Sequence, residues 1–155
     1  MNITYSHTIT ANEVNTIRKA IGWRQFNIEQ LQAELDGSAF IVAAYDGNNA
    51  IGMARLLWAG GVDAHIYNIL MPQYQNQGVE NELITRIFSF LRSKLKPGFG
   101  IQVDIKAWGN QEALYKQIGF QVSTTEQRGV PMHICLTNEI ELTDKFFKQI
   151  DFKEK

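Results

Sequence analysis

The spacing of apolar residues changes at Gly78, and that change limits the folds open to this chain. Before Gly78 the apolar residues fall in short runs, at 39–45, 51–58 and 64–71, which tight polar connections separate. Beyond Gly78 they recur at helical spacing as far as Leu91. Three successive short runs predict an antiparallel block of strands, and the longest helix of the chain follows it directly.

Two helix-start patterns lie before this block. Thr10 is followed three residues later by Glu13, which is the capping-box pattern and predicts a helix as far as Ala20. Asn27 repeats the pattern with an amide in the third position and predicts a second, shorter helix that ends at Gly37. The chain therefore reaches the strand block only after two helices.

Alternation of apolar and polar residues predicts further strands at 3–8, 99–107 and 132–137, and residues 111–118 follow a helical pattern. The predicted order is strand, two helices, three strands, helix, strand, helix, and then one or two strands. The sequence shows neither an internal repeat nor a low-complexity linker. We therefore expect a mixed α/β fold in a single domain over residues 1–155, with 138–155 as a C-terminal extension.

The composition restricts the partners of the chain. Its 15 basic and 16 acidic residues leave a formal net charge of −1, so no large positive field favours nucleic acid. No apolar run approaches the roughly 20 residues that a membrane span requires. The single Cys135 cannot form an internal disulfide, and the first residues lack the pattern of a secretory signal. We expect a cytoplasmic protein that does not bind membranes or nucleic acid.

An amide-rich segment, PQYQNQGVENELI from Pro72 to Ile84, joins the strand block to the long helix. The first N–H groups of a helix have no partner within the helix, and with the positive end of its dipole they form an anion site. Gly78 would let a diphosphate approach the backbone, because a Cβ there would crowd it. A glycine at such a turn also has a plainer use as a turn residue.

This segment resembles the acyl-CoA-binding motif of the GNAT N-acetyltransferase family, in which an apolar strand residue and a proline precede Q/R-x-x-G-x-G/A. Gln75 and Gly78 fit the motif, together with the two residues between them. The resemblance implies acetyl-CoA as cosubstrate. The cofactor-binding residues that it implies are Leu70, Gln75, Asn76, Gln77, Gly78, Val79, Glu80 and Asn81.

Glu80 departs from the motif, because it stands where the family has a second small residue. A carboxylate at this place would repel a diphosphate unless its side chain points away or finds a cation. We therefore expect Glu80 to affect the affinity for the cofactor rather than the fold.

The resemblance extends over residues 1–137 and implies the GNAT acyl-CoA N-acyltransferase fold. This fold has a central, mostly antiparallel sheet with a splayed parallel pair, flanked by helices. In the family a bulge separates the strand that ends at Met71 from the one that contains Val103, and the pantetheine amides bind there. The main chain of Leu70 is the expected contact.

A second match lies in residues 113–120, ALYKQIGF, which resemble the Y-x-x-x-G-F end of a later helix in the family. The resemblance implies that Tyr115 is the general acid that protonates the leaving thiol. The plainer alternative is that Tyr115 packs its helix against the sheet. The family's frequent asparagine has no clear equivalent, because Asn110 lies too close to Tyr115.

The candidate base is His65, on the strand that leads to the motif. A lysine-like amine with a pKa of about 10.4 is neutral in only about one molecule in 2,500 at pH 7, so a base or a water relay is useful. The intrinsic pKa of histidine, about 6.5, suits that task. A lone strand histidine is more often solvated or packed. The histidines show no metal-ligand spacing, so we expect no metal.

Several other side chains have two interpretations. Arg55 could pair with an acidic group of a substrate, or it could be an exposed strand charge. The tryptophans and Phe26 lie in or beside connections where the family's acceptor pocket forms, and they could shape that pocket or belong to the core. Cys135 has no adjacent base in the sequence, so we expect a buried, inert thiol rather than an acyl-enzyme.

We expect transfer of acetyl from acetyl-CoA to a primary amine of a small molecule or peptide, by direct attack in a ternary complex. One alternative is a non-catalytic CoA-binding or sensing module, which Glu80 and the lack of an obvious base favour. Another is an interaction domain that uses the apolar tail residues Phe146, Phe147 and Ile150. A homodimer is common among similar proteins.

Overall fold

The computed structural model describes residues 1–132. The chain divides into two compact units, of which the first is Met1–Lys106 and the second begins at Ala107. The predicted last strand beyond Met132, the C-terminal extension with its apolar tail residues, and Cys135 lie outside the described residues.

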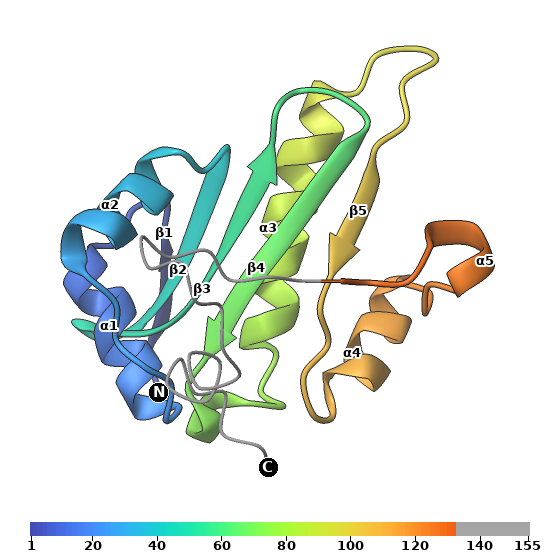
Figure 1. Cartoon of the computed structure of the whole chain (residues 1–155). Coiled ribbons are helices and arrows are strands. Elements are labelled where there is room, and N and C mark those ends of the chain that lie inside the picture. Colours follow the sequence, from blue (N-terminus) through green and yellow to red (C-terminus); the bar gives the residue numbers. More distant parts are fainter. Residues whose placement is uncertain (133–155) are drawn as a thin grey trace, which may run out of the picture. The chain divides into compact units, whose positions relative to one another are not determined.

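The first unit is a five-stranded sheet with three α-helices (Figure 1). Its elements in chain order are β1 (Ile3–Ser6), α1 (Ala11–Ala20), α2 (Ile28–Asp36), β2 (Phe40–Asp46), β3 (Asn49–Trp58), β4 (Asp63–Leu70), the short 3-10 helix η1 (Pro72–Tyr74), α3 (Val79–Lys94) and β5 (Gln102–Ile105). The described part of the second unit contains α4 (Gln111–Ile118) and α5 (Thr125–Arg128). The predicted order of elements is confirmed from β1 to α4.

The strands lie side by side in the order β1-β2-β3-β4-β5. The pairs from β1 to β4 are antiparallel, which confirms the predicted antiparallel block, whereas β4 and β5 are parallel. Parallel neighbours need a crossover connection, and α3 provides it. The sheet is therefore mixed, with its one parallel pair at the β5 edge.

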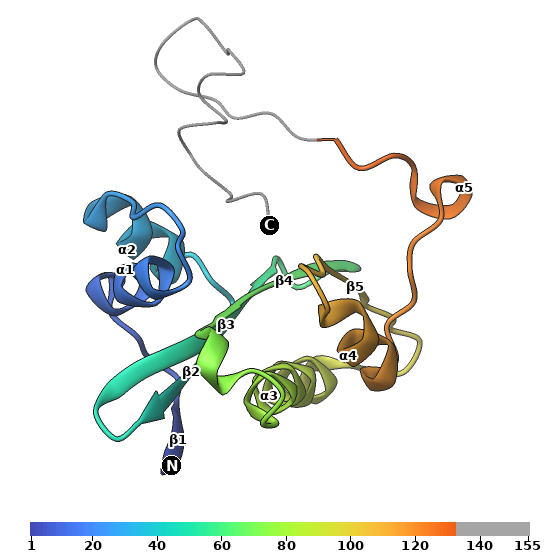
Figure 2. The ribbon, with the colours of Figure 1, turned by 90° about the horizontal axis from the view of Figure 1, so that it is seen from below.

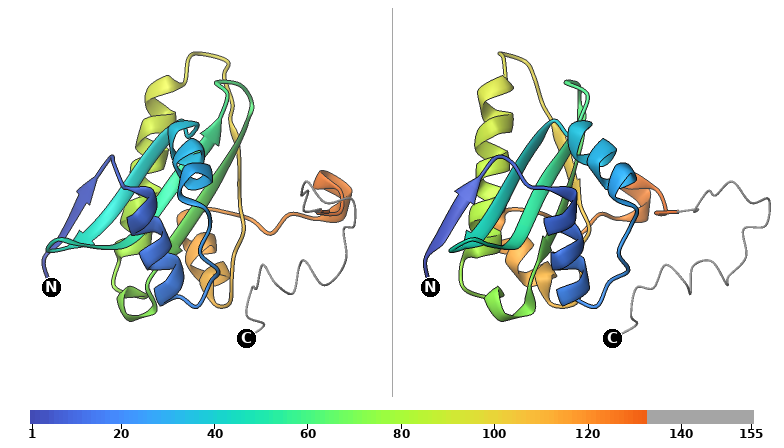
Figure 3. Two further views of the ribbon diagram at one scale, coloured as in Figure 1. Left: turned by 60° about the vertical axis from the view of Figure 1, so that its left-hand side comes forward. Right: turned by 90° about the vertical axis from the view of Figure 1, so that its left-hand side faces the viewer.

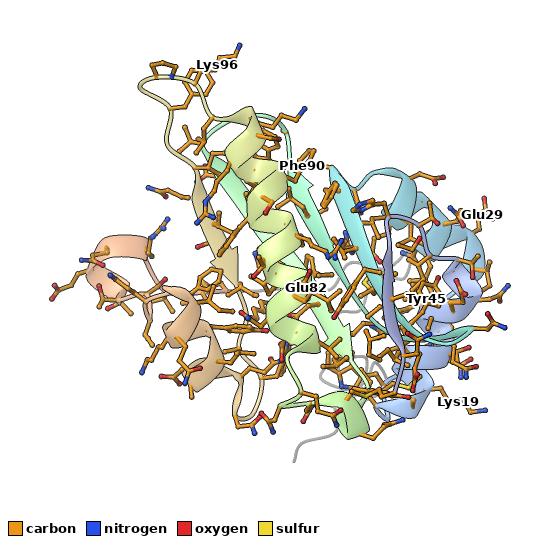
Figure 4. The ribbon with its side chains drawn as sticks, turned by 180° about the vertical axis from the view of Figure 1, so that it is seen from behind. Lys19, Glu29, Tyr45, Glu82, Phe90 and Lys96 are labelled. Carbon is orange, nitrogen blue, oxygen red and sulfur yellow. The ribbon has the colours of Figure 1, made fainter. Side chains whose placement is uncertain are left out.

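The two faces of this sheet carry different helices. Helix α3 lies on one face, and α1 and α2 lie on the other (Figures 2 and 3). On its face, α3 packs against β2 and β3 and buries Leu83, Ile84 and Ile87. Further along α3, Phe90 (Figure 4) stacks on Phe40 with ring centroids 4.4 Å apart. Strand β2 is thus covered on both faces, as its near-continuous apolar run predicts.

The opposite face has its own apolar cluster. It contains Ile17 of α1, Leu31 and Leu35 of α2, and Met53 of β3. Full burial of such a side chain contributes roughly 1.5–3 kcal/mol. The two short helices are therefore held on the sheet mainly by this cluster rather than by their own helical propensity.

Both predicted helix starts are confirmed at the level of hydrogen bonds. The hydroxyl of Thr10 accepts from the Glu13 N–H at 3.2 Å, and the Glu13 carboxylate accepts from the Thr10 N–H at 2.8 Å. Asn27 Oδ1 accepts from the Gln30 N–H at 3.1 Å.

Within residues 1–132, no helix combines the length and apolar character needed to cross a membrane.

Candidate active site

The parallel strands β4 and β5 separate part-way along β4. Their pairing runs from Asp63 opposite Gln102 to Ile66 opposite Ile105. Strand β4 then continues to Leu70, past the last paired position. Figure 1 shows the two strands diverging toward the start of α3. The predicted splayed parallel pair is therefore present.

The cause of this separation differs from the one that the resemblance implied. A bulge in β4 was expected, but β4 pairs with β3 without a shift in register along all its paired residues, so this expectation is wrong. The strands separate because β5 ends at Ile105 while β4 goes on. Strand β5 is also shorter than predicted, since Phe99 donates its N–H to the carbonyl of Lys96 at 2.9 Å in a turn before the strand.

A glycine allows the end of β4 to pack closely on β3. Gly52 lies opposite Leu70. A Cβ at Gly52 would lie 2.7 Å from Leu70 Cδ1 and 2.9 Å from the Ile69 carbonyl oxygen, inside the distance at which non-bonded atoms attract. Just beyond, the Met71 N–H donates to the Ile51 carbonyl at 2.9 Å. Leu70, the last residue of β4, is therefore packed closely on β3, and Met71 after it is held there by a hydrogen bond.

The loop between β4 and α3 is tied down by side-chain hydrogen bonds. The Tyr74 hydroxyl donates to Asp46 Oδ2 at 2.9 Å, which joins η1 to the end of β2. This bond lowers the pKa of the Asp46 carboxyl and raises the pKa of Tyr74. Within the loop, Gln77 Nε2 donates to the Gln73 carbonyl at 2.7 Å. The amide-rich segment is thus an ordered loop.

Gly78 occupies the N-cap position of α3 in a left-handed conformation, with φ 83° and ψ −6°. Apart from its two chain neighbours, no atom of residues 1–132 lies within 4 Å of the place where a Cβ would be. The first turn of α3 begins there, since the Glu82 N–H donates to the Gly78 carbonyl at 3.0 Å. The N–H groups of this first turn point out of the helix toward the loop. Together these features give a helix start that an anion can approach closely.

Glu80 turns its carboxylate to the sheet. The residue is buried, at 7% exposed, and its Oε1 accepts a 2.6 Å hydrogen bond from Asn68 Nδ2 on β4. Gly78 and Asn81 on either side of it are exposed. An acid at this place is compatible with a bound diphosphate if its side chain points away or if it pairs with a cation. The structure shows the first: the side chain points away.

The structure gathers the predicted cofactor-binding residues around one helix start. Leu70 lies at the end of β4, and the others follow without a break from the loop into the first turn of α3. The exposed members are Asn76, Gln77, Gly78 and Asn81, Gln75 is partly buried, and the buried ones are Leu70, Val79 and Glu80. Asn68, two positions before Leu70 on β4, is the neighbour whose bond with Glu80 the sequence analysis did not predict.

His65 lies on β4 next to the last residue that pairs with β5. Its Nε2 is buried and has no hydrogen-bond partner among the described residues. Its ring lies 4.5 Å from the ring of Tyr67. Burial, more than any neighbouring charge, lowers the pKa of His65, and Lys106 and Arg55 lower it further against the opposing effect of Asp104. The imidazole is therefore neutral near pH 7.

Arg55 is not the exposed strand charge that was its plainer interpretation, because it is only 6% exposed. Its Nη2 forms an ion pair with Glu34 Oε1 of α2, and its guanidinium lies 4.6 Å from the centre of the Tyr67 ring. Its Nη1 is buried without a hydrogen-bond partner in the described part of the chain. Arg55 is thus buried and only partly satisfied.

The candidate aromatic residues separate into two groups. Trp58 packs edge-on against Phe90 at 6.3 Å, which favours its role in the core on the α3 face. Trp23 and Phe26 lie between α1 and α2, where the Arg18 guanidinium covers both rings at 5.3 and 4.4 Å. These two aromatics therefore shape the α1–α2 connection, whereas Trp108 belongs to the second unit.

In the second unit the Y-x-x-x-G-F segment ends a helix as predicted. Gly119 caps α4 in a left-handed conformation with φ 118°, and the Phe120 N–H donates to the Tyr115 carbonyl at 2.9 Å. Tyr115 is buried, and its ring lies 5.8 Å from that of Phe120. Asn110 stands at the N-cap position without a side-chain capping bond.

The sequence matches the family described as acetyltransferase (GNAT) domain over residues 6–138. The chain therefore belongs to the GNAT acetyltransferase family, whose members use acetyl-CoA. No curated protein matches the sequence.

Solved structures share the fold. One is a protein from meticillin-resistant Staphylococcus aureus described as a probable acetyltransferase, with a TM-score of 0.74 and 20% identity over 85% of this chain and 99% of that chain. Another is a GNAT-family acetyltransferase from Streptococcus pneumoniae, with a TM-score of 0.66 and 23% identity over 89% of this chain and 98% of that chain. A third is N-acetylglutamate synthase from Neisseria gonorrhoeae, complexed with coenzyme A and N-acetylglutamate, with a TM-score of 0.60 and 17% identity over 82% of this chain and 30% of that chain. At these identities the likeness shows the common fold.

Proposed function

We propose that this protein transfers acetyl from acetyl-CoA to a primary amine of a small molecule or peptide, by direct attack in a ternary complex. The observation that carries the proposal is that α3 begins at Gly78, which has a left-handed conformation, next to the end of β4. Strand β4 extends beyond the last residue that pairs with its parallel neighbour β5. Membership of the GNAT family supports the reaction class, and a protein of the same fold was solved with coenzyme A.

The residues around Gly78 fit the diphosphate of acetyl-CoA. The open space at the Cβ position allows a phosphate to reach the backbone, and the first-turn N–H groups of α3 supply donors. Gln77 is exposed in the same loop, and its Nε2, which donates to the Gln73 carbonyl, has a second N–H to offer. The main chain of Leu70 would hold a pantetheine amide. Glu80 offers no obstacle, because its carboxylate is bound to Asn68.

Two residues of the protein, His65 and Tyr115, then transfer protons. Acetyl-CoA supplies a thioester whose acyl carbon bonds to the amine nitrogen as the carbon–sulfur bond breaks. His65 Nε2 takes the proton that the amine loses, which requires the neutral imidazole that burial favours. The Tyr115 hydroxyl gives a proton to the leaving sulfur. The role of Tyr115 rests on the motif match, and that of His65 on its buried, unpartnered nitrogen among the described residues.

The alternative of a non-catalytic CoA-binding module drew on Glu80 as an obstacle to the cofactor and on the lack of an obvious base. Glu80 is directed to the sheet, so the first of these reasons no longer applies. The role of His65 as the base belongs to the proposal. A homodimer and a cytoplasmic location stay predictions.

A pair of glycine variants tests the proposed cofactor site. Gly78→Val places a side chain where the diphosphate would lie, so we expect the Kd for acetyl-CoA to rise about tenfold or more in calorimetry. Gly60→Val is the matched control, since Gly60 has φ 87° and equally open space but lies in the β3–β4 turn. Both variants carry the same left-handed strain, so only the first should lose affinity. Equal affinities in the two variants would show that the cofactor binds elsewhere.

A further inference from the structure

Two buried nitrogen atoms on the α1–α2 face of the sheet have no hydrogen-bond partner among the described residues. They are Arg55 Nη1 and His65 Nε2. An unsatisfied buried polar group costs about 1–3 kcal/mol, and more when the group is charged. The Arg55 side chain is only 8% exposed, so water at the surface does not satisfy it. Two such groups on neighbouring strands call for an explanation.

The side chains of Arg55 and His65 both lie against the ring of Tyr67. Tyr67 lies opposite Arg55 in the β3–β4 register, and His65 lies two residues before Tyr67 on the same face of β4. The guanidinium stands 4.6 Å from the centre of the Tyr67 ring, and the imidazole 4.5 Å from it. Tyr67 is 42% exposed and Leu57, opposite His65, is 37% exposed. The two nitrogens therefore lie just beneath an accessible apolar surface.

The spacing of these groups suits one small molecule with two polar ends. Diagonal cross-strand neighbours such as Arg55 and His65 have Cβ atoms roughly 7–8 Å apart, and both side chains reach the same Tyr67 ring. The two polar groups are therefore near enough for one small ligand with an acceptor group at Arg55 and an amine at His65. His65 lies at the point where β4 separates from β5, which is where the proposed reaction takes place.

The charges around this position favour a single negative charge on the ligand. Glu34 acts on both Arg18 and Arg55, while Asp104 and Lys106 act on His65. Among these groups three are cations and two are anions, and the neutral His65 adds no charge. A carboxylate would balance the remaining positive charge, whereas a dianionic phosphate would exceed it. The planar guanidinium fork, with Nη2 already on Glu34, also matches the geometry of a second carboxylate.

We propose that the acceptor amine also carries a carboxylate, which Arg55 Nη1 binds while the amine lies at His65 Nε2. This inference rests on the proposed acetyl transfer and narrows its acceptor to amino acids and similarly built amino-carboxylates. Amines without an acid, such as polyamines, would leave Arg55 Nη1 unsatisfied. Arg55 is then the residue that selects the substrate, and His65 the one that deprotonates it.

Matched acceptors test the inference. Thiol release from acetyl-CoA is measured with a panel of amino acids, each beside its own α-amide, which keeps the amine and removes the negative charge. We expect the wild-type protein to prefer the acid by about tenfold or more in kcat/KM. Arg55→Gln should abolish this preference by raising the KM of the acid, while the KM for acetyl-CoA stays unchanged. Glu34→Gln, which breaks the ion pair but keeps Nη1, should retain the preference.

Each outcome of this experiment decides a separate point. Equal rates with acids and amides in the wild-type protein would overturn the carboxylate site and leave acetyl transfer intact. An undiminished preference in Arg55→Gln would overturn the role of Arg55. No acetylation of any member of the panel would overturn the inference, whereas acetylation of amines without an acid, such as polyamines, would then leave the proposed function intact. The wild-type comparison alone decides the first point if Arg55→Gln fails to fold.

Discussion

At the scale of single residues, Glu80 shows how a motif position can change without removing the site around it. The family has a small residue there, and an acid would be expected to oppose a diphosphate. In the structure the carboxylate is buried and accepts from Asn68 on the neighbouring strand. A residue that departs from a motif has thus become a link between α3 and the end of β4.

This link leads to a prediction for two variants of Glu80. Glu80→Gln keeps an acceptor for Asn68 and should change neither stability nor the Kd for acetyl-CoA appreciably. Glu80→Ala removes that acceptor and should lower the free energy of unfolding by about 1–3 kcal/mol, again with the Kd nearly unchanged. Urea unfolding and calorimetry give the two quantities. Much tighter cofactor binding by Glu80→Gln would mean that the carboxylate faces the diphosphate after all.

His65 leads to a prediction about pH. Its pKa is lower in the folded protein than its unfolded value of about 6.5, so the folded state binds fewer protons between those two values. The stabilising effect of a neutral His65 is complete above about pH 6.5 and is lost as the pH falls through this window. His65→Gln should therefore make unfolding stability less dependent on pH below 6.5. Denaturant unfolding at several pH values measures this, and parallel curves for the two proteins would contradict it.

At the scale of elements, local signals explain why the sequence predicted the helices and strands so closely. The start of α1 depends on Thr10 and Glu13, which are three residues apart and need no distant partner. The end of α4 likewise depends on Gly119. The start of α3 was predicted from Gly78 and the amides before it. A part of the candidate site that consists of one continuous segment is therefore readable from the sequence.

Contacts between elements were not predictable in this way. The ion pair of Arg55 with Glu34 joins a strand to a helix, and the bond of Asn68 with Glu80 joins β4 to α3. Both depend on strand register and on the side chain's direction, which the spacing of apolar residues does not determine. The same holds for the separation of β4 from β5, which follows from the early end of β5 at Ile105 rather than from a bulge.

At the scale of the whole molecule, Tyr115 lies in the second unit and the cofactor loop in the first, and the proposed acid role of Tyr115 rests on the motif match. We expect Tyr115→Phe to lower kcat by about tenfold to a hundredfold, at the weak end of general acid catalysis, since a thiol with a pKa of about 8.5 leaves readily. The Kd for acetyl-CoA should stay unchanged.

Phe120→Leu is the control, because it alters the ring packed against Tyr115 but keeps the hydroxyl of Tyr115. Steady-state kinetics and calorimetry measure both quantities. An unchanged kcat in Tyr115→Phe would remove the acid role, and a parallel loss of affinity would indicate that Tyr115 acts only in packing.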